Sequence, residues 1–351
     1  MPILINKDNK LFVFGYYHCN QLGLKTTGTI DALIQLEGFN NVTSLCCKND
    51  HTVFINDNKL FVCGDNAHGQ LGLGHKKKVK NPIQVKDFND VTLASCGGNH
   101  IAFINDNKLY TCGKNNYGQL GLGHNDNVNI PIQVGNFDNV TSVSCGYEHT
   151  AFISNHKLFV TGNSCSQQFS IYCCKKFKIY RNEINTPIQI EGFDNVTSVS
   201  CGDDYTAFIN DGKLFVCGEN INRQFGLNHD DYVDFPTQVK DFNNITSLSG
   251  GPNYIVFIND GKLFTCGYNF GGHFKSNRCN NPNQVEGFDN VILMYCDDDY
   301  ITFVNDNKMF IHGYDFEQHF DVNYIYVPVE ISNFEPFVPF DRFKRTKSAR
   351  N

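Results

Sequence analysis

The chain has 351 residues and a net charge of −7, which argues against a protein that coats nucleic acid with its whole surface. Hydrophobic residues make up 41% of the sequence, so a sizeable core is expected and global disorder is not. No apolar run approaches the roughly 18 residues of a membrane helix, and the first residues lack the apolar region of a secretory signal. We therefore expect an intracellular protein, cytoplasmic or nuclear, without a membrane segment.

Predicted strands begin near the N-terminus with Ile3–Ile5 and Leu11–Phe14. The units that follow each contain four short apolar runs separated by turn residues. In the unit of residues 82–121 these runs are Pro82–Val85, Val91–Cys96, His100–Ile104 and Lys108–Cys112. Four short strands per unit, joined by tight turns and without a helical period, are typical of a β-propeller blade.

Two markers repeat in step along the chain. The phrase Lys-Leu-Phe-x-x-Gly, or a close variant, ends seven times, at Gly15, Gly64, Gly113, Gly162, Gly218, Gly267 and Gly313. An aromatic residue before a turn and an apolar run also occurs seven times, at Phe39, Phe88, Phe137, Phe193, Phe242, Phe288 and Phe334. The dominant spacing of both markers is 49 residues, which indicates a repeat protein.

The chain ends with predicted strands at Val327–Ile331 and Phe337–Phe340. These two would complete a blade with the two N-terminal strands, and such sharing removes the open edges of the array. The sequence thus predicts an all-β fold, a seven-bladed β-propeller of residues 1–340 whose ring is closed by N- and C-terminal strands in one blade. An open solenoid is the alternative, and it would leave the matched half-blades unused. Residues 341–351 are predicted to be a basic tail.

Three segments carry a family resemblance. They are Gly64-Asp-Asn-Ala-His-Gly-Gln-Leu-Gly-Leu-Gly74, Gly113-Lys-Asn-Asn-Tyr-Gly-Gln-Leu-Gly-Leu-Gly123 and Ser144-Cys-Gly-Tyr-Glu-His-Thr150. The chain resembles the regulator-of-chromosome-condensation repeat family, including its alpha-tubulin-suppressor-like members, and the resemblance implies a seven-bladed propeller. It is weaker after Gly162, Gly267 and Gly313, where Gln-Leu-Gly is replaced.

The residues of these motifs are interpreted as structural. Leu71 and Leu120 are expected to fill the space between blades, while Gln70 and Gln119 satisfy backbone groups of the loops. A phosphate-cradling loop is the alternative, but no Lys-Ser/Thr follows the glycines. His51, His100 and His149 give way to tyrosine in later units, so they are expected to close a turn rather than bind metal or catalyse a reaction.

The fifteen cysteines show no Cys-x-x-Cys pattern, so a zinc site is not expected. In a reducing compartment they should be free thiols, and we predict no disulfide among Cys47, Cys96, Cys145 and Cys201. The sequence shows no paired carboxylates in a plausible cleft and no Ser-His-Asp order. It therefore predicts no catalytic residue, no metal and no cofactor, and it favours a protein without enzymatic activity while leaving that question open.

The strand order separates two ends of the propeller, one nearly uniform and one variable. The variable end is the predicted partner-binding face, because repeat proteins diversify binding through such loops. Its candidate residues are basic: Lys76, Lys77, Lys78, Lys80, Lys175, Lys176, Lys178 and Arg181. Acidic residues share the face at Asp203–Asp204, Asp230–Asp231, Asp234 and Asp297–Asp299. A second candidate is the tail, with Arg342, Lys344, Arg345, Lys347 and Arg350 against one aspartate.

We interpret the chain as a monomeric protein-interaction propeller, a scaffold or adaptor without enzymatic chemistry, whose partner is a protein. Contact with nucleic acid is expected only through the basic tail. The family resemblance implies one alternative, guanine-nucleotide exchange on a Ran-like small GTPase. It also implies another, recruitment of substrates for ubiquitin ligation, which would act in trans because no ligase domain is present.

Overall fold

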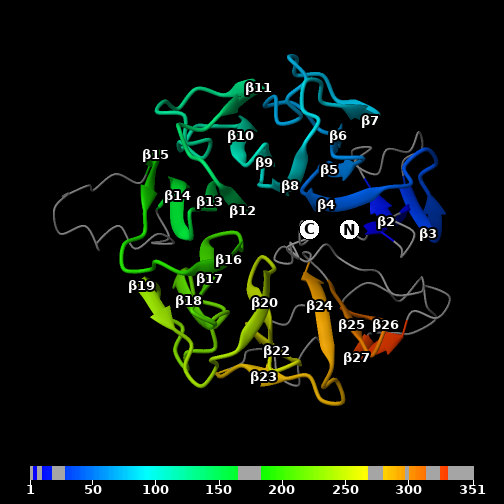
Figure 1. Ribbon diagram of the computed structural model, residues 1–351. Helices are drawn as coiled ribbons and strands as arrows, with labels where there is room; N and C mark the ends of the chain where they lie inside the picture. Colours follow the sequence, from blue (N-terminus) through cyan, green and yellow to red (C-terminus); the bar gives the residue numbers. More distant parts are fainter. Residues whose placement is uncertain are drawn as a thin grey trace, which may run out of the picture.

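The computed structural model describes residues 3–5, 10–17, 28–164, 183–267, 280–296, 300–313 and 325–330. All regular structure in these residues is β, in antiparallel sheets arranged around a central axis (Figure 1). Six sheets have four strands each and are numbered here as blades 1 to 6 in chain order. A further sheet of three strands stands at the N-terminus. No helix in the described part of the chain is long and apolar enough to cross a membrane.

The strands follow one another in sequence from the axis outward. The N-terminal sheet contains β1 (Ile3–Ile5), β2 (Leu11–Tyr17) and β3 (Gly28–Gln35). Blade 1 contains β4 (Val42–Lys48), β5 (His51–Asn56), β6 (Lys59–Gly64) and β7 (Val79–Gln84), and blade 2 contains β8 (Val91–Cys96), β9 (His100–Asn105), β10 (Lys108–Gly113) and β11 (Val128–Gln133). Blade 3 contains β12 (Val140–Cys145), β13 (His149–Ser154), β14 (Lys157–Asn163) and β15 (Glu183–Gln189).

The other three blades repeat this order. Blade 4 contains β16 (Val196–Cys201), β17 (Tyr205–Asn210), β18 (Lys213–Gly218) and β19 (Val233–Gln238). Blade 5 contains β20 (Ile245–Gly250), β21 (Tyr254–Asn259), β22 (Lys262–Gly267) and the short β23 (Asn283–Gln284). Blade 6 contains β24 (Val291–Cys296), β25 (Tyr300–Asn305), β26 (Lys308–Gly313) and β27 (Ile325–Glu330).

The prediction of seven blades is wrong, because the described residues form a propeller of six four-stranded blades. The seventh blade was to combine the N-terminal strands with Val327–Ile331, but β27 pairs with β26 through Phe310–Glu330 and Ile311–Val329, as the outer strand of blade 6. The same shift applies to every unit, since Pro82–Val85 belongs to the outer edge of blade 1 rather than to blade 2. Marker spacing gives the length of a repeat but not the point where one sheet ends. The predicted strand at Phe337–Phe340 lies outside the described residues.

Each blade is stabilised by a triad of aromatic rings, which explains the recurring aromatic marker. In blade 2, Phe88 packs edge-on against Phe103 at 4.8 Å and against Tyr110 at 5.0 Å between ring centroids. Phe103 and Tyr110 are stacked at 5.6 Å. The marker residue therefore packs the connection between blades 1 and 2 against strands β9 and β10 of blade 2. Edge-on and offset-stacked pairs of this kind contribute about 0.5–1.5 kcal/mol each beyond their buried area.

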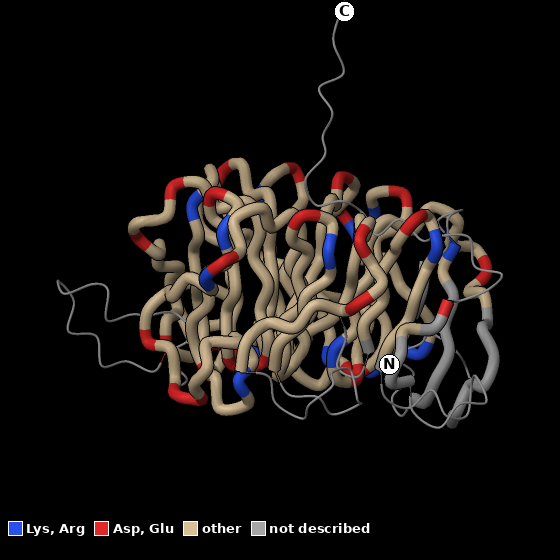
Figure 2. The backbone as a smooth tube through the Cα atoms, turned by 90° about the horizontal axis from the view of Figure 1, so that it is seen from below, with Lys and Arg blue, Asp and Glu red and all other residues tan. Residues whose placement is uncertain are grey.

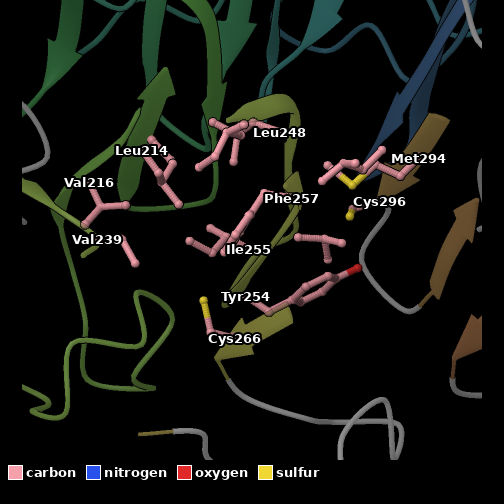
Figure 3. Close-up of a cluster of buried hydrophobic side chains, with 14 of the residues drawn as sticks. Leu214, Val216, Val239, Leu248, Tyr254, Ile255, Phe257, Cys266, Met294 and Cys296 are labelled. Atoms are coloured by element: carbon pink, nitrogen blue, oxygen red, sulfur yellow. The ribbon is translucent and has the colours of Figure 1, made fainter. Parts of the chain in front are cut away.

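The hydrophobic core lies between blades rather than within one sheet. Every residue of β5, β9, β13, β17 and β21 is buried, because these strands are covered on both faces. Figure 3 shows one such layer, in which Leu214 and Val216 of blade 4 and Phe257 of blade 5 belong to one cluster with Met294 of blade 6. Neighbouring blades thus depend on each other for their buried surface.

The turns of the blades form two opposite ends of the molecule, where most of the charged residues lie (Figure 2). One end, called the hairpin end here, carries two-residue turns such as Asp57-Asn58, whose φ values of 50° and 58° suit Asp and Asn. The other, called the loop end, carries the turns after the inner strands and the long loops before the outer strands. Pairing of His51 with Gly64 places both kinds of connection at this same end.

Candidate partner-binding face

The turns that follow the inner strands are joined into a chain of hydrogen bonds, called the collar here. The amide group of Asn49 donates to the carbonyl oxygen of Gly98 at 2.8 Å. The backbone N–H of Gly98 donates to Tyr147 at 3.0 Å, and that of Tyr147 donates to Asp203 at 3.0 Å. Asp203 continues the chain to Pro252 at 3.4 Å. The collar therefore links blades 1 to 5 around the axis at the loop end.

The long loops 65–78, 114–127 and 219–232 are held by a buried asparagine. The side-chain oxygen of Asn66 accepts from the backbone N–H of Leu71 at 3.0 Å, and its amide donates to the carbonyl groups of His75 and Lys77 at 2.7 and 3.1 Å. Asn115 and Asn220 occupy the same place in blades 2 and 4. The sequence interpretation missed this role, although each asparagine stands two residues after a marker glycine.

The interpretation of the Gln-Leu-Gly segment is confirmed. Gln70 accepts a hydrogen bond from the backbone N–H of His68 at 2.9 Å, and Gln119 does the same for Tyr117 at 3.0 Å. Leu71 and Leu120 are fully buried. These loops are thus built from satisfied backbone groups.

The recurring histidines bridge neighbouring blades, so the expectation that they close a turn is wrong. The Nε2 atom of His100 lies 2.9 Å from the hydroxyl of Thr150 in blade 3. That hydroxyl donates to the carbonyl of Gln119, so it accepts the N–H of His100. His149 reaches Thr206 of blade 4 in the same way, at 3.2 Å. Tyr205 performs the equivalent task by donating to the carbonyl of Gly251 in blade 5 at 2.8 Å.

Burial keeps these imidazoles neutral. It lowers the pKa of His100 and of His149 to about 3, with smaller effects from the neighbouring cation Lys48. The pKa of His51 is lowered to about 4 by burial, against the opposing attraction of Asp65 and Asp50. A charged imidazole would lack water in this position, so the neutral form is the one that the fold accommodates.

The glycine before each bridging ring leaves room for it. A Cβ atom on Gly97 would lie 2.0 Å from the His100 ring, and one on Gly146 would meet His149 at the same distance. Blade 1 has Lys48 at this position. Its ammonium group pairs with Asp203 of blade 4 at 2.7 Å, although β4 and β16 lie on different sides of the axis (Figure 1). Lys48 thus ties two distant blades together at the loop end.

An acidic patch surrounds Asp203. Burial raises the pKa of Asp204, and the nearby charges of Asp203 and Glu148 raise it further. Burial and the charge of Asp204 also raise the pKa of Glu219. Tyr232 is 44% exposed next to this patch and donates a hydrogen bond to Glu219. Crowded carboxylates beside an exposed ring favour a partner with positive charge.

A polar pocket of about 360 Å³ opens at the loop end of blades 1 and 2. Its wall includes Asp50, His51, Asp65, Gln70, Asn99 and the exposed ring of Tyr147. Three blades contribute to the wall, because the collar brings the turns of blades 1, 2 and 3 together. In the described part of the chain, no group of three or more His, Cys, Asp or Glu side chains could hold a metal ion.

The predicted basic residues are only partly described. Lys76, Lys77, Lys78 and Lys80 are all exposed at the loop end of blade 1, and none forms an ion pair with a described residue. The other candidates, Lys175, Lys176, Lys178 and Arg181, lie outside the described residues, as do the five basic residues of the tail. The acidic residues at 203–204 and 230–231 do share the end with the four lysines.

The expectation that all cysteines are free is wrong, because Cys46 and Cys96 form a disulfide with a Cα–Cα distance of 5.9 Å. The two cysteines belong to different blades, Cys46 to β4 and Cys96 to β8. The inner strands β4 and β8 converge near the axis, however, and this brings the two sulfur atoms together. No disulfide joins Cys47, Cys96, Cys145 and Cys201 to one another, since Cys47, Cys145 and Cys201 are free thiols.

The free inner-strand thiols should react slowly in the folded protein. Burial raises the pKa of Cys145 from 9.0 to about 11 and that of Cys201 to about 12. A shift of two units lowers the reactive thiolate fraction by roughly a hundredfold, and steric protection adds to this. Labelling with a water-soluble maleimide, read by mass spectrometry of peptides, should therefore modify both only after denaturation. Labelling of native Cys145 as fast as in the denatured chain would contradict this placement.

The sequence of residues 10–332 matches that of the RCC1-like domain. The chain belongs to the RCC1-like domain family. This confirms the resemblance predicted from the loop motifs, whereas the blade number implied by it is corrected above. No curated protein sequence matches the chain significantly.

Solved structures show the same RCC1-like fold. Human WBSCR16 superimposes with a TM-score of 0.78 at 19% sequence identity, over 92% of this chain and 94% of that chain. Yeast RCC1 (Prp20), solved with Kap60, gives a TM-score of 0.77 at 17% identity, over 94% and 85% of the chains. A second structure of Prp20p from Saccharomyces cerevisiae, described together with its binding to Gsp1p and histones, gives 0.75 at 18% identity, over 92% and 85%.

Proposed function

We propose that this RCC1-like propeller is a non-enzymatic scaffold or adaptor that binds a protein partner through its loop end. The observation that carries the proposal is a difference between loops of equal backbone structure. After the histidines that the buried asparagines hold, the next three residues are Lys76–Lys78 in blade 1, Asn125–Asn127 in blade 2 and Asp230–Tyr232 in blade 4. The three loops are held by the same hydrogen bonds but expose different side chains, and such variation on a constant backbone is typical of a recognition surface.

The charges of the loop end support a partner with both acidic and basic groups. The lysines of blade 1 would meet acidic groups, and the acidic patch of blades 3 and 4 would meet basic ones. Exposed Tyr147, Ile221 and Tyr232 add apolar area among these charges. The basic segment with Lys175, Lys176, Lys178 and Arg181 belongs to the same proposal. We place the partner inside the cell and treat the propeller as a monomer.

Charge reversal tests the assignment of the face. The variant Lys76→Glu/Lys77→Glu/Lys78→Glu should slow association with the partner and weaken its dependence on salt, because steering charges act mainly on the association rate. Folding should barely change, since the three side chains are exposed. The measurement is the association rate against salt, using the protein that the immobilised propeller retains from its native cells.

The matched control reverses Lys59, Lys108 and Lys213 at the hairpin end. It should bind the partner at nearly the normal rate. Slower association of this control, with normal association of the loop variant, would place the partner on the opposite end.

A second candidate function is nucleotide exchange on a small GTPase. The likeness to Prp20p, whose structure is described with its binding to Gsp1p, favours it. The same purification separates the two functions. Faster nucleotide release from a recovered GTPase in the presence of the propeller would support exchange. Unchanged release would support a scaffold, and recovery of ligase subunits would support substrate recruitment.

A further inference from the structure

We propose that the disulfide between Cys46 and Cys96 is a reversible redox modification site, which a thiol reductant opens to loosen blade 1 from blade 2 at the loop end. The inference goes beyond the proposed function, because its observations and its tests all concern the isolated protein. It is carried by a comparison of the boundaries between successive blades. At the boundary of blades 1 and 2, the disulfide stands where the other boundaries have hydrogen bonds.

Cys46 occupies a position at which the next four blades have serine. The hydroxyl group of Ser95 in blade 2 accepts a hydrogen bond from the backbone N–H of Cys145 in blade 3 at 3.0 Å. The same bond, at 2.8–3.2 Å, joins the equivalent pairs of the later boundaries: Ser144 with Cys201, Ser200 with Gly250, and Ser249 with Cys296. Cysteine in place of the serine brings a sulfur atom opposite Cys96, so a covalent bond replaces the hydrogen bond.

Two further links also differ at this boundary. The ring of His100 bonds the hydroxyl group of Thr150 across blades 2 and 3. The residue equivalent to Thr150 in blade 2 is Ile101, and the Nε2 atom of His51 has no hydrogen-bond partner among the described residues. The collar bond between blades 1 and 2 comes from the side-chain amide of Asn49, whereas the next three come from backbone N–H groups. The disulfide therefore compensates for weaker polar links between blades 1 and 2.

The disulfide is placed to control the first link of the collar. Asn49 follows Cys46 by three residues, and Gly98 follows Cys96 by two. The side chain of Asn49 donates to the carbonyl oxygen of Gly98 at 2.8 Å, so the disulfide fixes both segments that make this bond. Lys48, which pairs with a carboxylate of blade 4, belongs to the same segment as Asn49. Opening of the disulfide thus releases both turns of the loop end at once.

Exchange with a thiol opens the bond. Cys46 is partly exposed, whereas Cys96 is only 5% exposed, so the incoming thiolate attacks the Sγ atom of Cys46. The bond to Cys96 breaks, and Cys96 leaves with the electron pair and takes a proton from the solvent. A second thiolate of the reductant then attacks the mixed disulfide and releases Cys46 as a thiol. The reductant, a dithiol or two molecules of glutathione, is oxidised to a disulfide, and two electrons pass to the protein.

The reduced state has a counterpart at the next boundary, so the ring can remain folded. The sulfur atom of Cys96 lies 3.3 Å from the backbone carbonyl oxygen of Cys46. The free thiol of Cys145 donates to the equivalent carbonyl group of Ser95 at 3.6 Å. The thiol of reduced Cys96 therefore has an acceptor in place, and both redox states are compatible with the fold.

The test compares the oxidised and the reduced full chain in glutathione buffers of increasing reducing strength. Thiols are trapped with a maleimide and identified by mass spectrometry. Reduction under native conditions should expose Cys46 to labelling, lower the melting temperature by about 5 °C and speed amide hydrogen exchange in peptides that contain Lys48–Asp50 or Gly97–Asn99. A peptide of the hairpin end with Asp106-Asn107 should exchange equally in both states.

Two results would overturn the proposal. One is a disulfide that opens only when the protein is denatured, because the bond would then be purely structural. The other is native reduction that changes neither the melting temperature nor the exchange of the two loop-end peptides.

The variant Cys46→Ser is the matched control. It introduces the residue that the next four blades have, whose hydroxyl group can accept the backbone N–H of Cys96, so the variant should fold. Its melting temperature and its amide exchange should not respond to the reductant. A response as large as that of the unchanged chain would assign the effect to other cysteines and would overturn the role of this pair.

The variant Ser95→Cys tests the geometry at the next boundary. It gives blade 2 the residue that blade 1 has, opposite the free thiol of Cys145. Oxidation should join the introduced thiol to Cys145, which peptide mass spectrometry detects as a cross-link. Absence of this cross-link in a variant whose thermal melt shows that it is folded would contradict the equivalence of the two positions.

Discussion

Acidification from pH 7 to pH 5 is expected to reduce the free energy of unfolding by several kcal/mol. The three bridging histidines have pKa values of about 4, 3 and 3 in the folded protein, below the ordinary value of 6.5, because all three are buried. Between pH 6.5 and these lower values, the three histidines are protonated in the unfolded chain but remain neutral in the folded protein. The contribution of the three histidines to the free energy of unfolding is therefore fully present above pH 6.5, and it is lost as the pH falls toward 4 and then 3.

The size of the effect follows from the shifts. Each histidine lowers the free energy of unfolding by up to about 1.4 kcal/mol per pH unit in this window, so three together give roughly 4 kcal/mol per unit. The raised pKa values of Asp204 and Glu219 act in the opposite direction, but these groups are partly exposed and their effect is smaller. Because native proteins have only about 5–15 kcal/mol of stability, we expect the propeller to unfold near pH 5.

Urea unfolding at a series of pH values measures this slope. The variant His100→Gln should remove about one third of it, since one of the three shifted groups is gone. The variant His156→Asn replaces an exposed imidazole in a turn at the hairpin end and should leave the slope unchanged. A free energy of unfolding that stays constant between pH 7 and pH 5 would contradict the assignment of neutral, buried rings.

The variant Asn115→Ala should destabilise the protein by about 2–4 kcal/mol, because three hydrogen bonds are lost and the backbone N–H of the buried Leu120 is left without its acceptor. The bonds join the Asn115 side chain to the backbone of Leu120, His124 and Asp126, at 3.0, 2.7 and 3.1 Å. Asn66 makes the equivalent set in blade 1, so Asn66→Ala should have a similar effect. Thermal and urea unfolding measure both variants.

The adjacent residue provides the control for this experiment. Asn116 is exposed, and only its backbone carbonyl is used, by Asn125. Asn116→Ala should change stability by less than about 0.5 kcal/mol, as is usual for exposed positions. If Asn115→Ala were equally harmless, the asparagine could not be what holds the loop.

The sequence was sufficient for the all-β class, the blade-like sheets and the family, because local signals determine them. Turn residues such as Asp57-Asn58 and the alternation of short runs mark the strands directly, and the aromatic marker reflects a triad within one unit. The boundary between units, in contrast, is not marked by any local signal in the sequence. A run such as Pro82–Val85 could pair with the strands before it or after it, and only the sheet register decides between them.

Contacts between blades were the other feature that could not be predicted from the sequence. The disulfide of Cys46 with Cys96 and the bridge from His100 to Thr150 each join residues about fifty positions apart. The two residues of each pair are far apart in sequence, so no turn or motif indicates that they are in contact.

The collar has a consequence for the way the molecule opens. Its hydrogen bonds run from Asn49 to Pro252 and cross four blade boundaries at the loop end. A blade that separates from its neighbour must break a member of this chain as well as expose its share of the core. Local opening at one boundary is thereby coupled to the boundaries beside it, so the amide hydrogens of Gly98, Tyr147 and Asp203 should exchange with solvent as one cooperative unit.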